Sequence, residues 1–314
     1  MTNGRPKNQK KSDNYLFAID SKKDLARRLS TKHFSISEDE LDALAGDTGN
    51  FKLFPKTIKG KVREIQEPKR ALQRLHVRVH KILSRLEAPE YLHSTVRGRS
   101  YLSNASAHRG DVPVVKIDVK KYFASVPRVA VFKFFLEVMR CRRDVAGLLA
   151  NMLTFDKHLA TGSSASPILA YYVFQGMFDE IEKLATSKGL TMTCYVDDIT
   201  LSGAGANRGV LNDVRKIIAR YGLRSHKMCK FEAMQPKVIT GVCNSSTGKR
   251  VPNSLHLKIA DGFKELKELR AYENAETVLK PLLGRLEAAG QIDPAFRDQA
   301  RTLRTQFKAG SWVF

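Results

Sequence analysis

The sequence predicts an α+β fold in which helices cover one face of an antiparallel sheet. Short apolar strand patterns occur at VPVVKID, TMTCYVDDITLSG and PKVITGVCN, and stretches with helical periodicity separate them. With 314 residues and 42% hydrophobic composition, the chain is long enough to bury a sizeable core that is divided into subdomains.

The first third of the chain predicts a basic arm, short helices and a hairpin. Residues 1–14 are polar and basic without periodicity, which is typical of a flexible arm. Two short helices are expected before Gly46, the second opened by a capping box of Ser37 and Glu40. FKLFPKTIKGKVREIQEP predicts a β-hairpin with Lys59 and Gly60 at its turn.

Helical stretches then alternate with the strands. KRALQRLHVRVHKILSRLEAP has leucine, isoleucine and valine at helical spacing on one side and arginines on the rest, which predicts a basic amphipathic helix. In GSSASP, Ser166 is a candidate helix cap and Pro167 suits the first turn of a helix that runs to about Gly189. The segment from Leu255 onward is helical and highly charged, and its expected apolar positions are Leu266, Leu269, Leu279, Leu282, Leu283 and Leu286.

The charge balance predicts a polyanionic partner. The chain has 54 Lys+Arg against 32 Asp+Glu, a formal net charge of +22, and the basic residues are distributed along it. Nucleic acid is the obvious partner of this kind, whereas a merely soluble basic protein is the alternative.

The cysteines and the hydropathy pattern exclude other classes. The cysteines are isolated, so neither a zinc site nor a disulfide framework is expected. No apolar run reaches the length of a membrane span and no signal pattern opens the chain, so we expect a cytoplasmic protein without a membrane partner.

Two adjacent aspartates, Asp197 and Asp198, interrupt an otherwise apolar strand pair. Neighbouring strand residues point to opposite faces, so both can serve one site only if the backbone turns there. No lysine or arginine occurs from residue 191 to 203, so a divalent metal is the natural counter-charge. Asp118, at the end of VPVVKID, is a third carboxylate, and three carboxylates with two metal ions indicate phosphoryl or nucleotidyl transfer.

These motifs resemble those of a known family. YVDD, at residues 195–198, is similar to the catalytic box of reverse transcriptases, VVKIDVKKYFASV to their first carboxylate motif, and GSSASP to the glycine-serine-proline motif between them. The resemblance covers roughly residues 50–260 and implies a right-hand polymerase fold with fingers, a palm and a helical thumb. It also implies two Mg²⁺ ions, with Mn²⁺ as a substitute, held by Asp118, Asp197 and Asp198.

The resemblance implies roles for further residues around the nucleotide. Phe123 takes the place of the bulky residue that closes off the sugar 2′ position and favours dNTPs, and Lys56 and Arg63 match basic finger residues that grip the triphosphate. Gly162 belongs to the glycine-serine-proline motif, but Thr161 stands where the family usually has a glutamine. Lys227 is the first candidate for the lysine that follows the catalytic box, and Lys230 is the alternative.

Two further motifs are similar to those of retron reverse transcriptases. Asn104-Ala105-x-x-His108 resembles a signature before the first carboxylate motif, and Thr240-Gly241 in VITG resembles one after the catalytic box. We therefore expect RNA binding to involve Asn104, His108, Thr240, Gly241, Lys258, Lys264, Lys267 and Arg270. The expected domains are an arm (1–14), N-terminal helices and fingers (15–110), a palm with part of the fingers (111–252) and a thumb (253–314).

The resemblance implies a defined activity and defined partners. A retron enzyme binds a cognate structured non-coding RNA, primes from an RNA 2′-hydroxyl, and polymerises dNTPs into small single-stranded DNA (msDNA). Such systems typically act in anti-phage defence with an effector protein encoded nearby. The alternatives are a group II intron-like or other bacterial reverse transcriptase, or a non-catalytic RNA-binding protein on a polymerase scaffold. From the chain length we expect none of the extra domains of the intron type.

Overall fold

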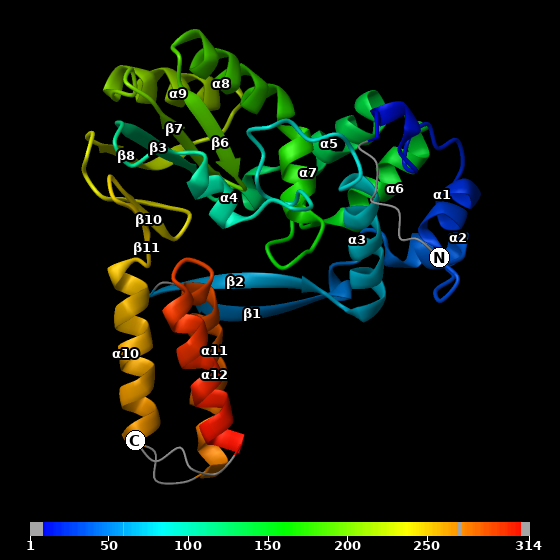
Figure 1. Cartoon of the computed structure of the whole chain (residues 1–314). Helices are drawn as coiled ribbons and strands as arrows, with labels where there is room; N and C mark the ends of the chain where they lie inside the picture. The colour runs from blue at the N-terminus through cyan, green and yellow to red at the C-terminus, as the bar shows by residue number, and fades with distance from the viewer. Residues whose placement is uncertain (1–8, 59, 269–271, 309–314) are drawn as a thin grey trace.

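The palm is built on a four-stranded antiparallel sheet. The computed structural model describes residues 9–58, 60–268 and 272–308 (Figure 1). In the sheet the strand order is β6 (Thr191–Tyr195), β7 (Asp198–Ser202), β3 (Val114–Val119) and β8 (Ser225–Phe231). Because β3 and β7 are the central strands, their apolar residues are buried on both faces, and the predicted α+β sheet is confirmed.

Helices cover one face of this sheet, as the sequence predicts. In Figure 1, α8 (Gln175–Ser187) and α9 (Arg208–Arg220) lie together over β6, β7 and β3. The single helix expected from Ser166 to about Gly189 is wrong, because the chain leaves helical geometry at Phe174 and α7 (Ser166–Val173) ends there. Ala165 is the N-cap, and Ser166 instead donates from Oγ to the Ala160 carbonyl at 2.7 Å.

The fingers contain the predicted hairpin and basic helix. β1 (Phe51–Ile58) pairs with β2 (Lys61–Pro68), and Gly60 in the turn has a φ of 73°. Lys59 lies outside the described residues. α3 (Arg70–Leu83) follows and buries the apolar side that the sequence indicates, with Leu72, Leu75, Val79, Ile82 and Leu83 all in the core.

Shorter elements surround α3 and the sheet. The predicted capping box of Ser37 and Glu40 opens α2, in which both reciprocal hydrogen bonds are present. The helices are α1 (Lys22–Leu29), α2 (Glu38–Leu44), α4 (Tyr101–Ser106), α5 (Arg128–Lys133) and α6 (Arg143–Leu153). The short strands are β4 (Thr154–Phe155), β5 (His158–Leu159), β9 (Lys237–Ile239), β10 (Val242–Ser245) and β11 (Gly248–Arg250).

Three helices form the thumb. They are α10 (Asn253–Glu268), α11 (Tyr272–Gly290) and α12 (Pro294–Lys308), and Figure 1 shows them beside one another below the palm. Their buried apolar residues form a cluster separate from the main core of the palm and fingers. Leu266, Leu279, Leu282 and Leu286 are in this cluster, as the leucine spacing predicts. Among the described residues, no helix has the length and apolar character that crossing a bilayer requires.

A buried lysine fastens the loop before β3 to the β9–β11 sheet. Lys237 is fully buried, and its ammonium donates to the carbonyls of Gly110 (2.9 Å), Val112 (2.6 Å) and Glu232 (3.2 Å). Gly110 packs so closely that an added Cβ would lie 1.9 Å from the Ser245 carbonyl oxygen. The path into β3, and so the position of Asp118, depends on this contact.

We expect Gly110→Ala to lower the free energy of unfolding by about 1–3 kcal/mol, because backbone atoms have to move to admit the methyl group. Chemical denaturation measures the change. Gly147→Ala is the control, since a Cβ at that position in α6 meets nothing within 4 Å and alanine favours a helix. Equal stability of the two variants would contradict the packing argument.

Candidate active site

A two-residue turn brings the adjacent aspartates to one edge of the palm sheet. Tyr195 pairs with Asp198, so Val196 and Asp197 form the turn between β6 and β7. Val196 has a φ of 61°, a strained conformation for a β-branched residue. Its amide donates to Ser94 Oγ at 3.0 Å, and the Val119 amide donates to the Asp197 carbonyl at 3.0 Å. These bonds hold the strained turn against the end of β3.

The strand register brings the third carboxylate to the same edge. Asp118 is the direct partner of Asp198 across β3 and β7. The two side chains are 18% and 26% exposed, so the carboxylates are sheltered yet open to solvent. The three aspartates that the sequence singles out therefore lie together, although the part assigned to each in catalysis stays a prediction.

Two lysines from neighbouring strands supply positive charge to the carboxylates. Lys116 Nζ lies 3.1 Å from Asp198 Oδ2, and Lys227 Nζ lies 2.8 Å from Asp118 Oδ2. Residues 191–203 contain no lysine or arginine, and the cations of the folded site come instead from β3 and β8. Sequence proximity does not report contacts across strands.

A β-bulge directs Lys227 toward Asp118. The pairing of β3 with β8 shifts between Lys116 and Asp118, and Lys227 within the shift has a φ of 51°. Such bulges re-aim side chains next to functional sites. Lys230, the alternative, forms an ion pair with Glu232 at 2.8 Å. The geometry therefore favours Lys227 over Lys230 as the lysine of the site.

His226 is a residue of the site that the sequence did not reveal. It is the register partner of Asp118 on β8, and its Nδ1 lies 3.5 Å from Asp118 Oδ1. A histidine next to a lysine in a short strand pattern does not by itself indicate a functional site. Only the pairing of β8 with β3 places it at the carboxylates.

Burial and mutual repulsion raise the pKa of two carboxyls. The pKa of Asp197 is raised to about 6, first by desolvation and then by the charge of Asp118. The pKa of Asp198 is also raised by desolvation, and Lys116 opposes that shift. The site therefore concentrates more negative charge than its surroundings neutralise.

The donor chemistry of the edge fits divalent cations. Asp118 Oδ1 is buried without a hydrogen-bond partner among the described residues, and carboxylate oxygens are the ligands that Mg²⁺ prefers. The described residues do not, however, contain a cluster of three acidic, histidine or cysteine side chains already converged as ligands. The two lysine ammonium groups hold carboxylate oxygens that a metal ion would use.

Phe123 lies just beyond the end of β3. It opens a 3₁₀ turn, Phe123–Ser125, after Lys121 bends the backbone with a φ of 51°. Its ring packs 5.9 Å from that of Tyr122, whose hydroxyl donates to the Ala170 carbonyl at 2.9 Å. Packing on a buried tyrosine gives Phe123 a fixed position, and its role in selecting the sugar stays a prediction.

The predicted triphosphate residues sit on the hairpin of the fingers. Lys56 and Arg63 are cross-strand partners on β1 and β2, and both are exposed. Neither forms an ion pair within the described part of the chain. Lys56 and Arg63 are therefore neighbours on the hairpin. Their contact with a nucleotide stays a prediction.

A glutamine from the hairpin binds Thr161, the residue that stands where the family usually has a glutamine. Gln66 is buried, and its Oε1 accepts hydrogen bonds from the Thr161 amide (3.1 Å) and hydroxyl (3.0 Å). At Gly162 an added Cβ would lie 2.7 Å from the Gln66 carbonyl oxygen. The glycine thus allows the palm loop to lie directly against β2 and couples it to the strand that carries Arg63.

The two retron-like motifs contact each other. Thr240 and Gly241 form the turn between β9 and β10 with φ values of 44° and 88°, so the single strand expected through this segment is wrong. The Thr240 hydroxyl donates to the Tyr101 carbonyl at 2.8 Å and accepts from Asn104 Nδ2 at 3.4 Å. These hydrogen bonds join α4 to a turn that is far from it in the sequence.

Burial argues against direct RNA contact by Asn104 and His108. Asn104 is fully buried, and His108 is 3% exposed with ring nitrogens 2.7 Å from the hydroxyls of Ser202 and Thr193. Desolvation lowers the pKa of His108 to about 3, so it is neutral. His108 thus braces strands β6 and β7 of the palm sheet, whereas Asn104 binds the β9–β10 turn. Asn244, which the sequence did not reveal, is buried beside them and donates to the carbonyls of Ala105 and His108.

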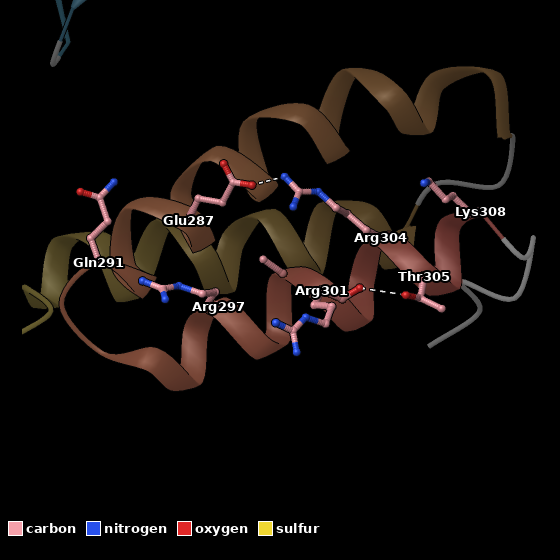
Figure 2. Close-up of a pocket in the computed structure, with 8 residues that line it drawn as sticks. Glu287, Gln291, Arg297, Arg301, Arg304, Thr305 and Lys308 are labelled. Atoms are coloured by element: carbon pink, nitrogen blue, oxygen red, sulfur yellow. Dashed lines mark hydrogen bonds and ion pairs between the residues drawn. The ribbon is translucent and has the colours of Figure 1, made fainter. Parts of the chain in front are cut away.

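The thumb carries the predicted lysines and a further basic groove. Lys258, Lys264 and Lys267 are exposed on α10, whereas Arg270 lies outside the described residues. A groove with a volume of about 550 Å³ lies between α11 and α12 (Figure 2). It is lined by Glu287, Gln291, Arg297, Ala300, Arg301, Arg304, Thr305 and Lys308. Glu287 forms an ion pair with Arg304 across it. The helical spacing of the basic residues in AFRDQARTLRTQFK could have indicated this groove.

Comparison with known proteins identifies the family. Residues 54–242 match the family model described as reverse transcriptase (RNA-dependent DNA polymerase). The chain belongs to the reverse transcriptase family. The apo telomerase structure from Candida tropicalis shares the fold with a TM-score of 0.50 at 12% identity, over 85% of this chain and 58% of that one. The predicted right-hand polymerase fold is confirmed.

The similar curated proteins are retron reverse transcriptases. The Ec48 enzyme of Escherichia coli is 24% identical over 83% of this reverse transcriptase and 71% of its own length. The Se72 enzyme of Salmonella heidelberg is 31% identical over 45% of this chain and 38% of its own, and the Ec86 enzyme of Escherichia coli is 28% identical over 67% and 64%. The matches thus span less than two thirds of the Se72 and Ec86 enzymes. The resemblance to retron-type reverse transcriptases is confirmed.

We expect Asp197→Asn to stabilise the metal-free protein by about 1–3 kcal/mol at neutral pH, because it removes a desolvated charge. The folded wild-type chain holds this proton more tightly than the unfolded chain. The free energy of unfolding of the wild type therefore falls as pH rises from the ordinary carboxyl pKa of about 4 to about 6, the pKa of Asp197 in the folded chain. Above that pH this contribution no longer changes.

Thermal unfolding of both proteins in chelator, from acid to neutral pH, measures the difference. The difference in melting temperature, variant minus wild type, should grow between about pH 4 and about pH 6. A constant difference would contradict the raised pKa.

Proposed function

We propose that this reverse transcriptase copies part of a cognate structured non-coding RNA into small single-stranded DNA that stays with the RNA. The observation that carries the proposal is the meeting of Asp118, Asp197 and Asp198 at one edge of the palm of a chain with retron-type relatives. The substrates are dNTPs, priming uses an RNA 2′-hydroxyl, and the protein acts in the bacterial cytoplasm. It works in anti-phage defence with an effector protein encoded nearby.

Asp118, Asp197 and Asp198 would hold two Mg²⁺ ions. When bound, the ions activate the attacking hydroxyl and stabilise charge on the phosphates. The aspartates orient this site, and the raised pKa values of Asp197 and Asp198 favour binding of positive charge. In the metal-free protein, Lys116 and Lys227 balance the charge of the carboxylates. A metal ion that binds Asp118 would displace Lys227, whose ammonium would then be free to bind the leaving pyrophosphate.

Other parts of the chain would position the substrates. Lys56 and Arg63, on an exposed hairpin, would bind the triphosphate as a point charge and a bidentate fork. The hydrogen bonds of Gln66 to Thr161 keep this hairpin in register with the palm. Lys258, Lys264, Lys267, Arg270 and the turn at Thr240 and Gly241 would contact RNA, for which backbone charge and shape matter more than duplex sequence.

The domains proposed for these tasks follow the sequence boundaries. Residues 15–110 form the N-terminal helices and fingers, 111–252 the palm with part of the fingers, and 253–314 the thumb, after an arm at 1–14. The flexibility expected of this arm is wrong for residues 9–14, because Asn14 is buried and its Nδ2 donates to the Ile82 carbonyl at 3.0 Å. The separate apolar cluster of the thumb supports the last boundary. A group II intron-like reverse transcriptase or a silent RNA-binding scaffold is the alternative that the experiments below test.

We expect Asp197→Ala to abolish DNA synthesis and to leave RNA binding within about twofold, because the residue holds charge at the reacting centre and is not one of the cations proposed to contact RNA. The protein is expressed with its native flanking DNA, and the nucleic acid that copurifies is run on a denaturing gel. A discrete DNase-sensitive, RNase-resistant species should accompany the wild type and be missing from the variant. RNA alone with both proteins would favour the silent scaffold.

We expect Phe123→Ala to raise ribonucleotide incorporation relative to dNTP incorporation by about tenfold or more, since loss of the ring opens space for a 2′-hydroxyl. Single-nucleotide extension with each nucleotide measures the ratio. Phe155→Ala is a matched control, because Phe155 is also half-buried but packs on Phe51. Unchanged selectivity in the Phe123 variant would remove this residue from the role.

A further inference from the structure

A basic groove lies on the N-terminal side of the molecule. It has a volume of about 390 Å³ and is lined by Leu29, Thr31, Phe34, Arg70, Gln73, Arg74, Val77, Arg78 and Lys81. The lining comes from the end of α1, the turn that follows it, and one side of α3. Figure 1 shows α1 and α3 on the side of the fingers away from the thumb helices, so the groove is separate from that of Figure 2.

The positive charge of this groove is not neutralised by carboxylates. Four of its lining residues are cationic and none is acidic. Within the described ranges, Arg70, Arg74, Arg78 and Lys81 form no ion pair. The thumb groove differs, since Glu287 pairs with Arg304 and Asp298 lies 3.8 Å from Arg301.

An aromatic ring lies among these cations. The Arg74 guanidinium lies over the Phe34 ring, 5.6 Å from its centroid. Phe34 is only partly buried, and hydrogen bonds between Thr31 and Phe34 in both directions fix its turn. Leu29 and Val77 add apolar surface. The lining thus offers an aromatic ring and apolar surface together with charge.

The cations follow one side of α3 at helical spacing. Arg70, Arg74 and Lys81 are all exposed, and Arg70 and Arg74 are separated by about 6 Å along the helix axis at ~1.5 Å per residue. Arg78 is held closer in, with its Nη2 donating to the Arg28 carbonyl at 3.0 Å. A row of cations beside an aromatic face is how proteins bind single-stranded nucleic acid, with phosphates on the charges and a base on the ring.

We propose that the groove between α1 and α3 binds single-stranded nucleic acid, through phosphate contacts to Arg70, Arg74 and Lys81 and stacking of a base on Phe34. A double helix would satisfy the charges but not the ring, because its bases are enclosed. α3 begins two residues after β2 ends, so a strand that passes the fingers hairpin reaches the groove directly. The identity of the bound strand, template or product, rests on the proposed function. The binding of single-stranded nucleic acid in the groove does not depend on it.

The test measures binding without DNA synthesis. The full chain, freed of nucleic acid, is titrated into a labelled oligonucleotide of about 16 nucleotides, in DNA and RNA forms, and anisotropy is followed at several salt concentrations. Arg70→Ala with Arg74→Ala should weaken binding at least about fivefold and reduce the salt slope by about 1.4, since each phosphate contact contributes ~0.7. Arg215→Ala with Lys216→Ala, an equal charge change on α9, is the control.

A second measurement locates the strand. An oligonucleotide carrying 5-bromouracil is photocrosslinked, and the attachment site is mapped by mass spectrometry. Crosslinks within residues 29–34 or 70–81 that are lost in Phe34→Leu, which keeps the apolar packing, support the proposal. Equal affinity of the groove and control variants, or crosslinks confined to other elements, would overturn it and leave the charge to an acidic protein partner. Primer extension is measured on the wild type and the same variants. Failure of the polymerase proposal would appear as an inactive wild type, whereas failure of the groove proposal would appear as unchanged binding by the groove variants.

Discussion

Electrostatic repulsion among three carboxylates is the constraint around which the palm is organised. Asp118, Asp197 and Asp198 lie at one sheet edge, where desolvation and mutual charge raise the pKa of Asp197 and Asp198. The fold tolerates this because Lys116 pairs with Asp198 and Lys227 pairs with Asp118. The strained valine in the turn and the bulge in β8 are local departures from ideal geometry that make this convergence possible. Strain of this kind is characteristic of functional sites.

The rest of the molecule supports that edge from three sides. The segment before β3 is fastened by the buried ammonium of Lys237, the turn of the catalytic box is held by Ser94, and the palm loop at Gly162 is held against β2 by Gln66. Each tie uses a polar group in a largely buried position, where an unmade hydrogen bond is costly. The carboxylates are therefore placed by hydrogen bonds from other elements and by strand register together.

The sequence predicted what depends on local pattern. Apolar periodicity located the strands of the palm, the buried side of α3 and the leucines of the thumb, and the doubled aspartate required a turn. It did not predict features created by pairing between distant segments. His226 and Lys116 reach the site through strand register, and Gln66 binds Thr161 from a distant segment. The helix break at Phe174 was not predicted either. Asn104 and His108 were recognised as a motif, but only burial shows that they act from inside the fold.

The contact between the two retron-like motifs has a consequence for exchanging parts between relatives. Asn104 and Thr240 are hydrogen-bonded across a separation of 136 residues, and Asn244 binds the carbonyl of His108 across the same separation. A chimera that inherits α4 from one parent and the β9–β10 turn from another breaks these links wherever the parents differ at Asn104, Thr240 or Asn244. The two segments are therefore one unit of inheritance, and substitutions in them should be compensated jointly as the family diverges.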